Sequence, residues 1–202
     1  MTASAGRGAG EVRRRGEAQR IRTAGRMEKP LVIVLTGNGK GKSTSAFGQV
    51  LRASGHGMKA LVVQFVKSPG EYGEIAALRR VPGAEVHTLG IGFVGGPHGG
   101  GASKEEHRKA ALAALNLARE RASSGGFHLV VLDEANFALS AGLLEKEEVL
   151  GFLDGLEGPM AVILTGRGAP AWLADRADTV TEMLEVKHHY AAGIKAKKGI
   201  EF

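Results

Sequence analysis

Short apolar runs and segments of helical periodicity alternate along the chain from residue 30 onward. The apolar runs, rich in Val, Ile and Leu, predict buried strands at 31–36, 60–66, 129–132, 160–164 and 179–184, with a shorter one at 85–88. The segments between them predict helices over 43–54, 103–122, 146–153 and 169–177, the second opened by a capping box of Ser103 and Glu106. This alternation predicts an α/β fold in which a mostly parallel sheet carries helices on both faces.

Positive charge is concentrated at the start of the chain. The formal net charge is +6, but residues 1–29 contain eight Lys or Arg and three Asp or Glu, so the rest of the chain is nearly neutral. We interpret residues 1–27 as a basic, partly disordered N-terminal arm and residues 28–202 as one folded domain. A basic arm can bind nucleic acid, form a solvated helix or clamp a partner subunit. The nearly neutral body disfavours the first of these, so no nucleic-acid partner is expected.

Composition also bears on redox chemistry and on location. The chain contains no cysteine, which excludes disulfide bonds and thiolate metal sites. Its longest apolar runs are far shorter than the roughly 20 residues that cross a bilayer, and no apolar signal segment follows the N-terminal arginines. We therefore expect a cytoplasmic protein with no membrane partner.

A glycine-rich loop, Thr36-Gly-Asn-Gly-Lys-Gly-Lys-Ser43, joins the first predicted strand to the first predicted helix. This is the context of a Walker A phosphate loop, in which backbone N–H groups and the helix N-terminus bind phosphate oxygens. Lys42 would supply a positive charge, and the Ser43 hydroxyl would bind Mg²⁺. Thr36 departs from the usual pattern, which has glycine there, and the alternative is a glycine turn with a chance Lys-Ser pair. The strand, the alternating glycines and the helix favour nucleotide binding.

A second half of a nucleotide site follows the predicted strand at 129–132. That strand ends in Asp133-Glu134, the arrangement of a Walker B segment. Asp133 would hold a metal ion directly or through water, and Glu134 would polarise a water or complete the metal shell. The alternative is that Asp133 only caps a helix. With the phosphate loop upstream, the sequence favours a metal site of Ser43, Asp133 and Glu134.

Several stretches of the body resemble the P-loop type corrinoid adenosyltransferase family of the cobalamin pathway. They are Leu35–Gly48, Arg52–Gly57, Val63–Lys67, Val130–Glu134, Leu164–Gly168 and the C-terminal segment Val186–Phe202, so the resemblance runs from about residue 28 to the end. The C-terminal segment is the most diagnostic, since a generic ATPase has no need of it. Thr36 is the family's own departure from the general loop pattern.

The resemblance implies a fold, a reaction and an assembly. The fold is a three-layer P-loop NTPase fold of the RecA type. The reaction moves the 5′-deoxyadenosyl group of ATP to cobalt reduced to the +1 state, and triphosphate leaves. The family is expected to be homodimeric, to depend on Mg²⁺ or Mn²⁺, and to receive electrons from a flavoprotein reductase. The nucleophile is then the metal of the substrate, so the protein's tasks are to stabilise the leaving group and to position the 5′-carbon.

The resemblance also assigns residues to these tasks. Lys42, Ser43 and Glu134 are the expected catalytic residues. The expected ATP-binding residues are Thr36, Gly37, Asn38, Gly39, Lys40, Gly41, Lys42, Ser43, Thr44, Arg167 and His188. Arg167 could instead be a surface arginine, and His188 could merely pack the C-terminal segment. Lys67, at the carboxyl end of a predicted strand, is a further candidate.

Corrinoid binding is expected in the glycine-rich segment 90–101. By resemblance, Phe93 packs on the lower axial face of the corrin and keeps a ligand away from cobalt. His98, in the same segment, is a candidate for contact with the ring or its side chains. The alternatives are that Phe93 anchors the loop in the core and that His98 is solvated. Relatives often carry a second aromatic residue two positions after the first, and this chain has Gly95 there. Which corrinoid is preferred is open at this point.

Two other classes compete with this interpretation. A P-loop ATPase or kinase of another pathway would release ADP and phosphate, or transfer the γ-phosphate. A RecA-like nucleic-acid-binding ATPase would use the basic arm to hold DNA, and its binding would depend strongly on salt.

Overall fold

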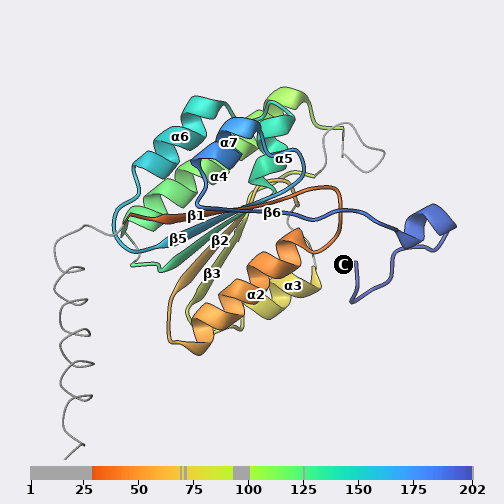
Figure 1. Ribbon diagram of the computed structural model, residues 1–202, viewed down its shortest axis with the longest axis horizontal. Helices are drawn as coiled ribbons and strands as arrows, with labels where there is room; N and C mark the ends of the chain where they lie inside the picture. Colours follow the sequence, from red (N-terminus) through yellow and green to blue (C-terminus); the bar gives the residue numbers. More distant parts are fainter. Residues whose placement is uncertain (1–28, 69, 71, 93–100, 125, 202) are drawn as a thin grey trace, which may run out of the picture.

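The computed structural model describes residues 29–68, 70, 72–92, 101–124 and 126–201. They build a six-stranded sheet in the order β3-β2-β4-β5-β1-β6 (Figure 1), in which every strand pairs in parallel with its neighbours. The strands are β1 Leu31–Thr36, β2 Ala60–Gln64, β3 Ala84–Thr88, β4 Leu129–Asp133, β5 Ala161–Thr165 and β6 Thr179–Glu182. This confirms the predicted α/β fold, consistent with a RecA-like P-loop architecture.

Helices cover both faces of the sheet and complete three layers. Helices α2 (Lys42–Gly55) and α3 (Gly73–Leu78) lie on one face, as Figure 1 shows. The opposite face is covered by α4 (Lys104–Ser124), α5 (Ala135–Ser140), α6 (Lys146–Asp154) and α7 (Ala171–Arg176). None of the helices in the described part of the chain combines the length and the apolar character of a membrane span.

The two faces of the sheet bury two separate hydrophobic clusters. All five residues of β2 and all five of β4 are buried, as expected for central strands covered on both sides. Side chains that alternate along each strand are divided between the clusters: Val130 and Leu132 pack toward the α4 side, and Val131 packs toward α2. This explains why both strands are apolar at every position except the last, Gln64 in β2 and Asp133 in β4, and show no alternation with polar residues.

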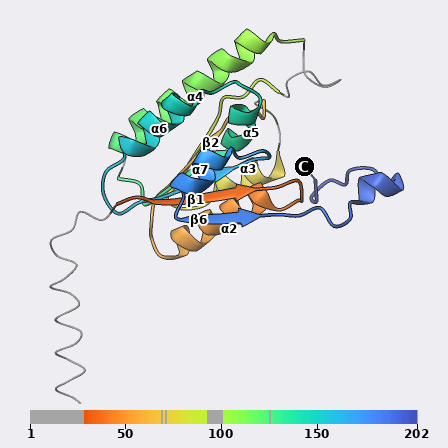
Figure 2. The same ribbon diagram turned by 45° about the horizontal axis from the view of Figure 1, so that its top comes forward.

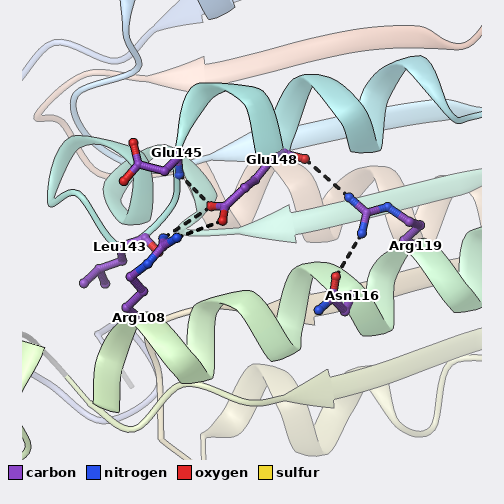
Figure 3. A network of polar contacts seen from close by, with 6 residues as sticks. All are labelled: Arg108, Asn116, Arg119, Leu143, Glu145 and Glu148. Atoms are coloured by element: carbon purple, nitrogen blue, oxygen red, sulfur yellow. Dashed lines mark hydrogen bonds and ion pairs between the residues drawn. The ribbon is translucent and has the colours of Figure 1, made fainter. Parts of the chain in front are cut away.

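Helices α4 and α6 are joined by a polar network at the surface (Figure 3). Arg108 of α4 donates to both carboxylate oxygens of Glu148 at 3.3 and 2.8 Å, and to the carbonyl oxygen of Leu143 at 3.0 Å. The same Glu148 side chain accepts from the backbone N–H of Glu145 at 2.7 Å and closes the capping box of α6. One carboxylate therefore both caps a helix and ties it to its neighbour.

The sequence predictions for the elements are largely confirmed, with small shifts at their ends. The capping box of Ser103 and Glu106 is present, with the Glu106 N–H donating to Ser103 Oγ at 3.2 Å and the Ser103 N–H to Glu106 Oε2 at 2.7 Å. Two helices of six residues each, α3 and α5, were not predicted. They are too short for a helical apolar stripe to be visible in sequence.

The chain leaves β6 and does not rejoin the sheet. It extends away from the body, forms a 3₁₀ turn at His189–Ala192 (η1), and then returns so that its end lies beside the start of α2 (Figures 1 and 2). Residues 197–201 form the turn at that end. The C-terminal segment is thereby brought to the same edge of the sheet as the loop that follows β1.

Candidate active site

The loop between β1 and α2 is shaped by its glycines and by a close contact with residues 183–184. Gly37 and Gly41 adopt positive φ angles of 93° and 110°, which disfavour any residue with a Cβ atom. A Cβ on Gly37 would lie 2.4 Å from the Met183 carbonyl oxygen, and one on Gly39 would lie 2.6 Å from that of Leu184. The Gly39 N–H donates to the Met183 carbonyl at 2.7 Å. Glycine is thus required by both backbone conformation and space at position 37, by space at position 39 and by backbone conformation at position 41.

Lys42 turns back into the curve of this loop. Its ammonium donates to the carbonyl oxygens of Gly37 at 2.7 Å and Gly39 at 2.6 Å, and the residue is only 8% exposed. Burial lowers the pKa of Lys42, and the nearby Glu134 carboxylate opposes that shift. The geometry holds a positive charge inside the loop, in the place where an anion bound by the loop would need it.

Asp133 and Glu134, consecutive in sequence, are directed to different places. Asp133 is fully buried, where its carboxylate accepts from the Gln64 amide at 2.9 Å and from the Thr165 hydroxyl at 2.8 Å. Glu134 has φ 66°, the one positive value at a non-glycine residue in the described chain, and its N–H donates to Thr165 Oγ1 at 3.0 Å. The left-handed conformation of Glu134 marks the end of β4, and Glu134 lines the cavity described below whereas Asp133 does not.

Glu134 lies among several charges. Burial raises its pKa above the ordinary value, and the neighbouring Asp133 carboxylate raises it further. Lys42, Lys67 and Arg167 act in the opposite direction. Cations from three different segments of the chain therefore favour the ionised form of one buried carboxylate.

A cavity of about 1030 Å³ opens at this edge of the sheet. One wall is the phosphate-type loop, and charged side chains from the neighbouring strand ends complete its polar part. The polar lining consists of Asn38, Gly39, Lys40, Gly41, Lys42, Ser43, Thr44, Lys67, Glu74, Glu134 and Arg167. Such a collection of cations beside a glycine-rich loop and the start of a helix fits a polyphosphate.

The cavity also has an apolar wall. It is built from α2, α3 and the turn that follows α3, with Phe47, Leu51, Ala77, Leu78 and Val81 as the lining side chains. Phe137 and Ile200 add apolar surface from α5 and from the C-terminal segment. A ligand that carries both a polyphosphate and a ring system would match these two walls.

The C-terminal segment contributes directly to this cavity. Gly199, Ile200 and Glu201 line it, and the Glu201 carboxylate forms an ion pair with Lys40 of the loop. The His189 imidazole lies 3.3 Å from the other Glu201 oxygen. The cavity is therefore enclosed by residues from opposite ends of the described chain.

The structure brings most of the sequence-predicted site residues together. Asn38 through Thr44, Glu134 and Arg167 all line the cavity. Thr36 and Gly37 shape the base of the loop, and Thr36 Oγ1 accepts from the Ala169 N–H at 3.2 Å. Asp133 supports the cavity from beneath. Phe93 and His98 lie outside the described residues.

His188 is placed differently from the cavity residues. It does not line the cavity but caps η1, where Nδ1 accepts from the Tyr190 N–H at 3.1 Å. Its ring stacks on that of His189, with centroids 4.5 Å apart. In this arrangement His188 supports the C-terminal segment and does not reach the loop.

Sequence reasoning missed part of the site. It assigned no role to Glu201, to Glu74 of α3 or to the apolar wall, because these residues belong to no recognised motif. Glu201 did carry a signal, since it lies in the C-terminal stretch singled out above as the most diagnostic. Lys67, a candidate from sequence, lines the cavity, forms an ion pair with Glu74 and lies 5.1 Å from the centre of the Tyr72 ring.

Comparisons with known proteins point to one family. Residues 28–202 match the family model described as ATP:corrinoid adenosyltransferase BtuR/CobO/CobP. The chain is 45% identical to the corrinoid adenosyltransferase of Pseudomonas aeruginosa over 178 residues, covering 88% of this chain and 86% of the relative. It is 38% identical to corrinoid adenosyltransferase CobA of Salmonella typhimurium over 175 residues, covering 87% of each chain. The corrinoid adenosyltransferase of Escherichia coli K12 is 37% identical over 175 residues, with the same coverage.

Proposed function

The chain belongs to the ATP:corrinoid adenosyltransferase family, and we propose that the glycine loop and its cavity are where it transfers the 5′-deoxyadenosyl group of ATP to a reduced corrinoid. The new bond forms between cobalt, in its +1 state, and the 5′-carbon of ATP. The bond that breaks joins this carbon to the 5′-oxygen, and its electron pair leaves with triphosphate. The product is an adenosylated corrinoid, in the synthesis or salvage of adenosylcobalamin.

One observation supports this proposal: the glycine loop with its cations and a group of apolar side chains line the same cavity. The reaction makes triphosphate the leaving group, so catalysis needs positive charge and N–H donors where negative charge accumulates. Lys42, buried inside the loop, and the backbone of Asn38 through Ser43 would meet this need. Arg167, at the carboxyl end of β5, would add a second cation to the same anion.

The residues present also fit a magnesium ion. The Ser43 hydroxyl and the Glu134 carboxylate both line the cavity, and oxygen donors of these types are the ligands that Mg²⁺ prefers. The described residues contain no cluster of three His, Cys, Asp or Glu side chains. Mg²⁺ usually keeps several waters and shares phosphate oxygens, so a sparse protein ligand set suits it. The ion, or Mn²⁺ in its place, would neutralise charge on the triphosphate. Asp133 would contact the ion indirectly, through a water molecule of its coordination shell.

Further parts of the proposal rest on the family. We expect Phe93 and His98 to contact the corrinoid, and His188 to contact the nucleotide if the C-terminal segment closes further. We also expect a cytoplasmic homodimer that receives electrons from a flavoprotein reductase, with the basic arm at residues 1–27 covering the partner's site. Sedimentation of the full chain against one lacking residues 1–27 would test the assembly, and unchanged activity of the shortened chain would contradict the role of the arm.

Product analysis tests the proposed function. The enzyme is incubated with ATP, Mg²⁺ and chemically reduced cobalamin, and both the phosphorus products and the light-sensitive corrinoid are measured. The proposal predicts triphosphate and adenosylcobalamin in equal amounts. Lys42→Met should lower kcat/KM by about 100-fold or more, the usual cost of losing a donor to a developing anion. The matched control is Lys109→Met, an exposed lysine of α4. ADP and phosphate as products would contradict the proposal and favour an ordinary ATPase or kinase.

A further inference from the structure

The C-terminal turn is held at the cavity by polar contacts, with little apolar packing. Ile200 lines the cavity but remains 71% exposed, and Ile194 is 47% exposed. The backbone N–H groups of Ile200 and Glu201 both donate to the Lys197 carbonyl, at 3.1 and 2.9 Å. This turn presents the Glu201 carboxylate to the loop. The segment is thus attached mainly through one acidic side chain.

Glu201 is well covered for a residue so near the end of the chain. Its side chain is 15% exposed, compared with 47% for its partner Lys40. Lys40 holds the pKa of Glu201 below the ordinary value, so the carboxylate is ionised at neutral pH. A negative charge is therefore built into the wall of a cavity that fits a polyphosphate, where it would oppose binding unless Lys40 compensated for it.

The charged side chains that line the cavity indicate a role for the Lys40–Glu201 ion pair. Four cations line it, and two of them are engaged by glutamates that also line it: Lys67 by Glu74 and Lys40 by Glu201. Lys42 and Arg167 form no ion pair within the described residues. The loop would hold triphosphate after the reaction with the same contacts that stabilise it as leaving group. A carboxylate that pairs again with Lys40 would weaken the binding of triphosphate to the loop.

We propose that Glu201 is a positioning residue of the active site that shares Lys40 with the polyphosphate and thereby lowers the affinity of the loop for released triphosphate. In the free enzyme Glu201 holds Lys40 at the mouth of the cavity. When a polyphosphate is bound, Lys40 lies between two anions, and it returns to Glu201 as triphosphate leaves. This inference rests on the proposed function, because it takes the polyphosphate to bind at this loop.

The test is a double-mutant cycle on triphosphate binding, measured by calorimetry with sodium triphosphate and Mg²⁺ at low salt and without corrinoid. Glu201→Gln should bind triphosphate about three- to tenfold more tightly than the wild type, since one carboxylate fewer faces a multiply charged anion. In the Lys40→Met background the same change should give a gain of less than about twofold. Glu157→Gln is the control, because it removes an exposed carboxylate just before β5, at the opposite edge of the sheet.

Two results would overturn the proposal. One is that Glu201→Gln binds triphosphate no more tightly than the wild type does. The Lys40–Glu201 ion pair would then only attach the C-terminal segment to the loop. The other is a full gain in the Lys40→Met background, which would mean that Glu201 acts without Lys40. Adenosyl transfer by the wild type is measured separately. If the cycle gives the expected gains but the wild type does not transfer the adenosyl group, the role of Glu201 is supported and the proposed function is contradicted. If none of the four proteins binds triphosphate, both are contradicted.

Discussion

Replacing Thr165 by valine would test how the two carboxylates at the end of β4 are held. Thr165 is fully buried at the end of β5, and its hydroxyl makes two hydrogen bonds to the β4 end. It donates to Asp133 Oδ1 at 2.8 Å and accepts from the N–H of Glu134 at 3.0 Å. Valine has nearly the same shape and suits a strand, so the change removes the hydroxyl and little else.

The expected cost follows from the groups left without a partner. Asp133 is also fully buried, so solvent water does not reach its carboxylate to replace the lost donor. An unsatisfied buried polar group costs about 1–3 kcal/mol, more when it is charged, and here a carboxylate oxygen and a backbone N–H are both affected. We expect Thr165→Val to lower the free energy of unfolding by about 3–5 kcal/mol. That is a large share of the roughly 5–15 kcal/mol of a typical domain.

Urea denaturation followed by far-UV circular dichroism measures this loss. The control is Thr165→Ser, which keeps the hydroxyl and removes one methyl group, at a cost of about 1 kcal/mol. The valine variant should have a midpoint at least about 1 M urea below that of the serine variant. Equal midpoints for the two variants would refute the reasoning, since the hydroxyl would then contribute nothing to holding Asp133 and Glu134.

Three further predictions concern charged groups. Burial raises the pKa of Glu134 above its ordinary 4.5, so the folded state binds this proton more tightly than the unfolded chain and stability falls as pH rises. Glu134→Gln should therefore raise Tm at pH 7 but not at pH 4, while abolishing activity; a gain equal at both pH values would contradict this. Arg121 holds the pKa of Glu85 at about 2, so their pair stabilises the fold above pH 4.5 and is lost as pH falls toward 2. Arg121→Met should lower Tm at pH 7, and the deficit should shrink below pH 4.5 in a calorimetric pH series. Arg108→Met, at the network of Figure 3, should lower the midpoint of chemical denaturation, and Arg119→Met should lower it less, because Arg108 makes two contacts to the Glu148 carboxylate and Arg119 makes none.

Much of the fold could be predicted because its signals are local. The strands of the sheet interior are apolar at every position except the last, and the glycines of the loop Thr36–Ser43 indicate a turn from strand to helix. The capping box of Ser103 and Glu106 fixed the start of a helix to within one residue. Helix α3 gave no such signal, because six residues beginning with Gly73 are shorter than two helical turns.

The site was predicted where it depends on motif residues and missed where it depends on distant contacts. Lys40 and Glu201 are separated by 161 positions, and only the return of the C-terminal segment brings them together. The left-handed φ of 66° at Glu134, where β4 ends beside the cavity, is likewise indicated by no residue pattern. The apolar wall likewise forms only when α3 packs beside α2. These features are properties of tertiary packing, which overrides local propensity.

The measurement that tests the central claim most directly is the fate of the oxygen bound to the 5′-carbon of ATP. ATP carrying ¹⁸O at this bridging position is incubated with the enzyme, Mg²⁺ and reduced cobalamin, and the products are analysed by mass spectrometry. Attack on carbon while the loop holds the leaving group predicts that all of the label departs in triphosphate and none stays with the nucleoside. Label retained on the adenosine part, with phosphate transferred or released in its place, would contradict the account.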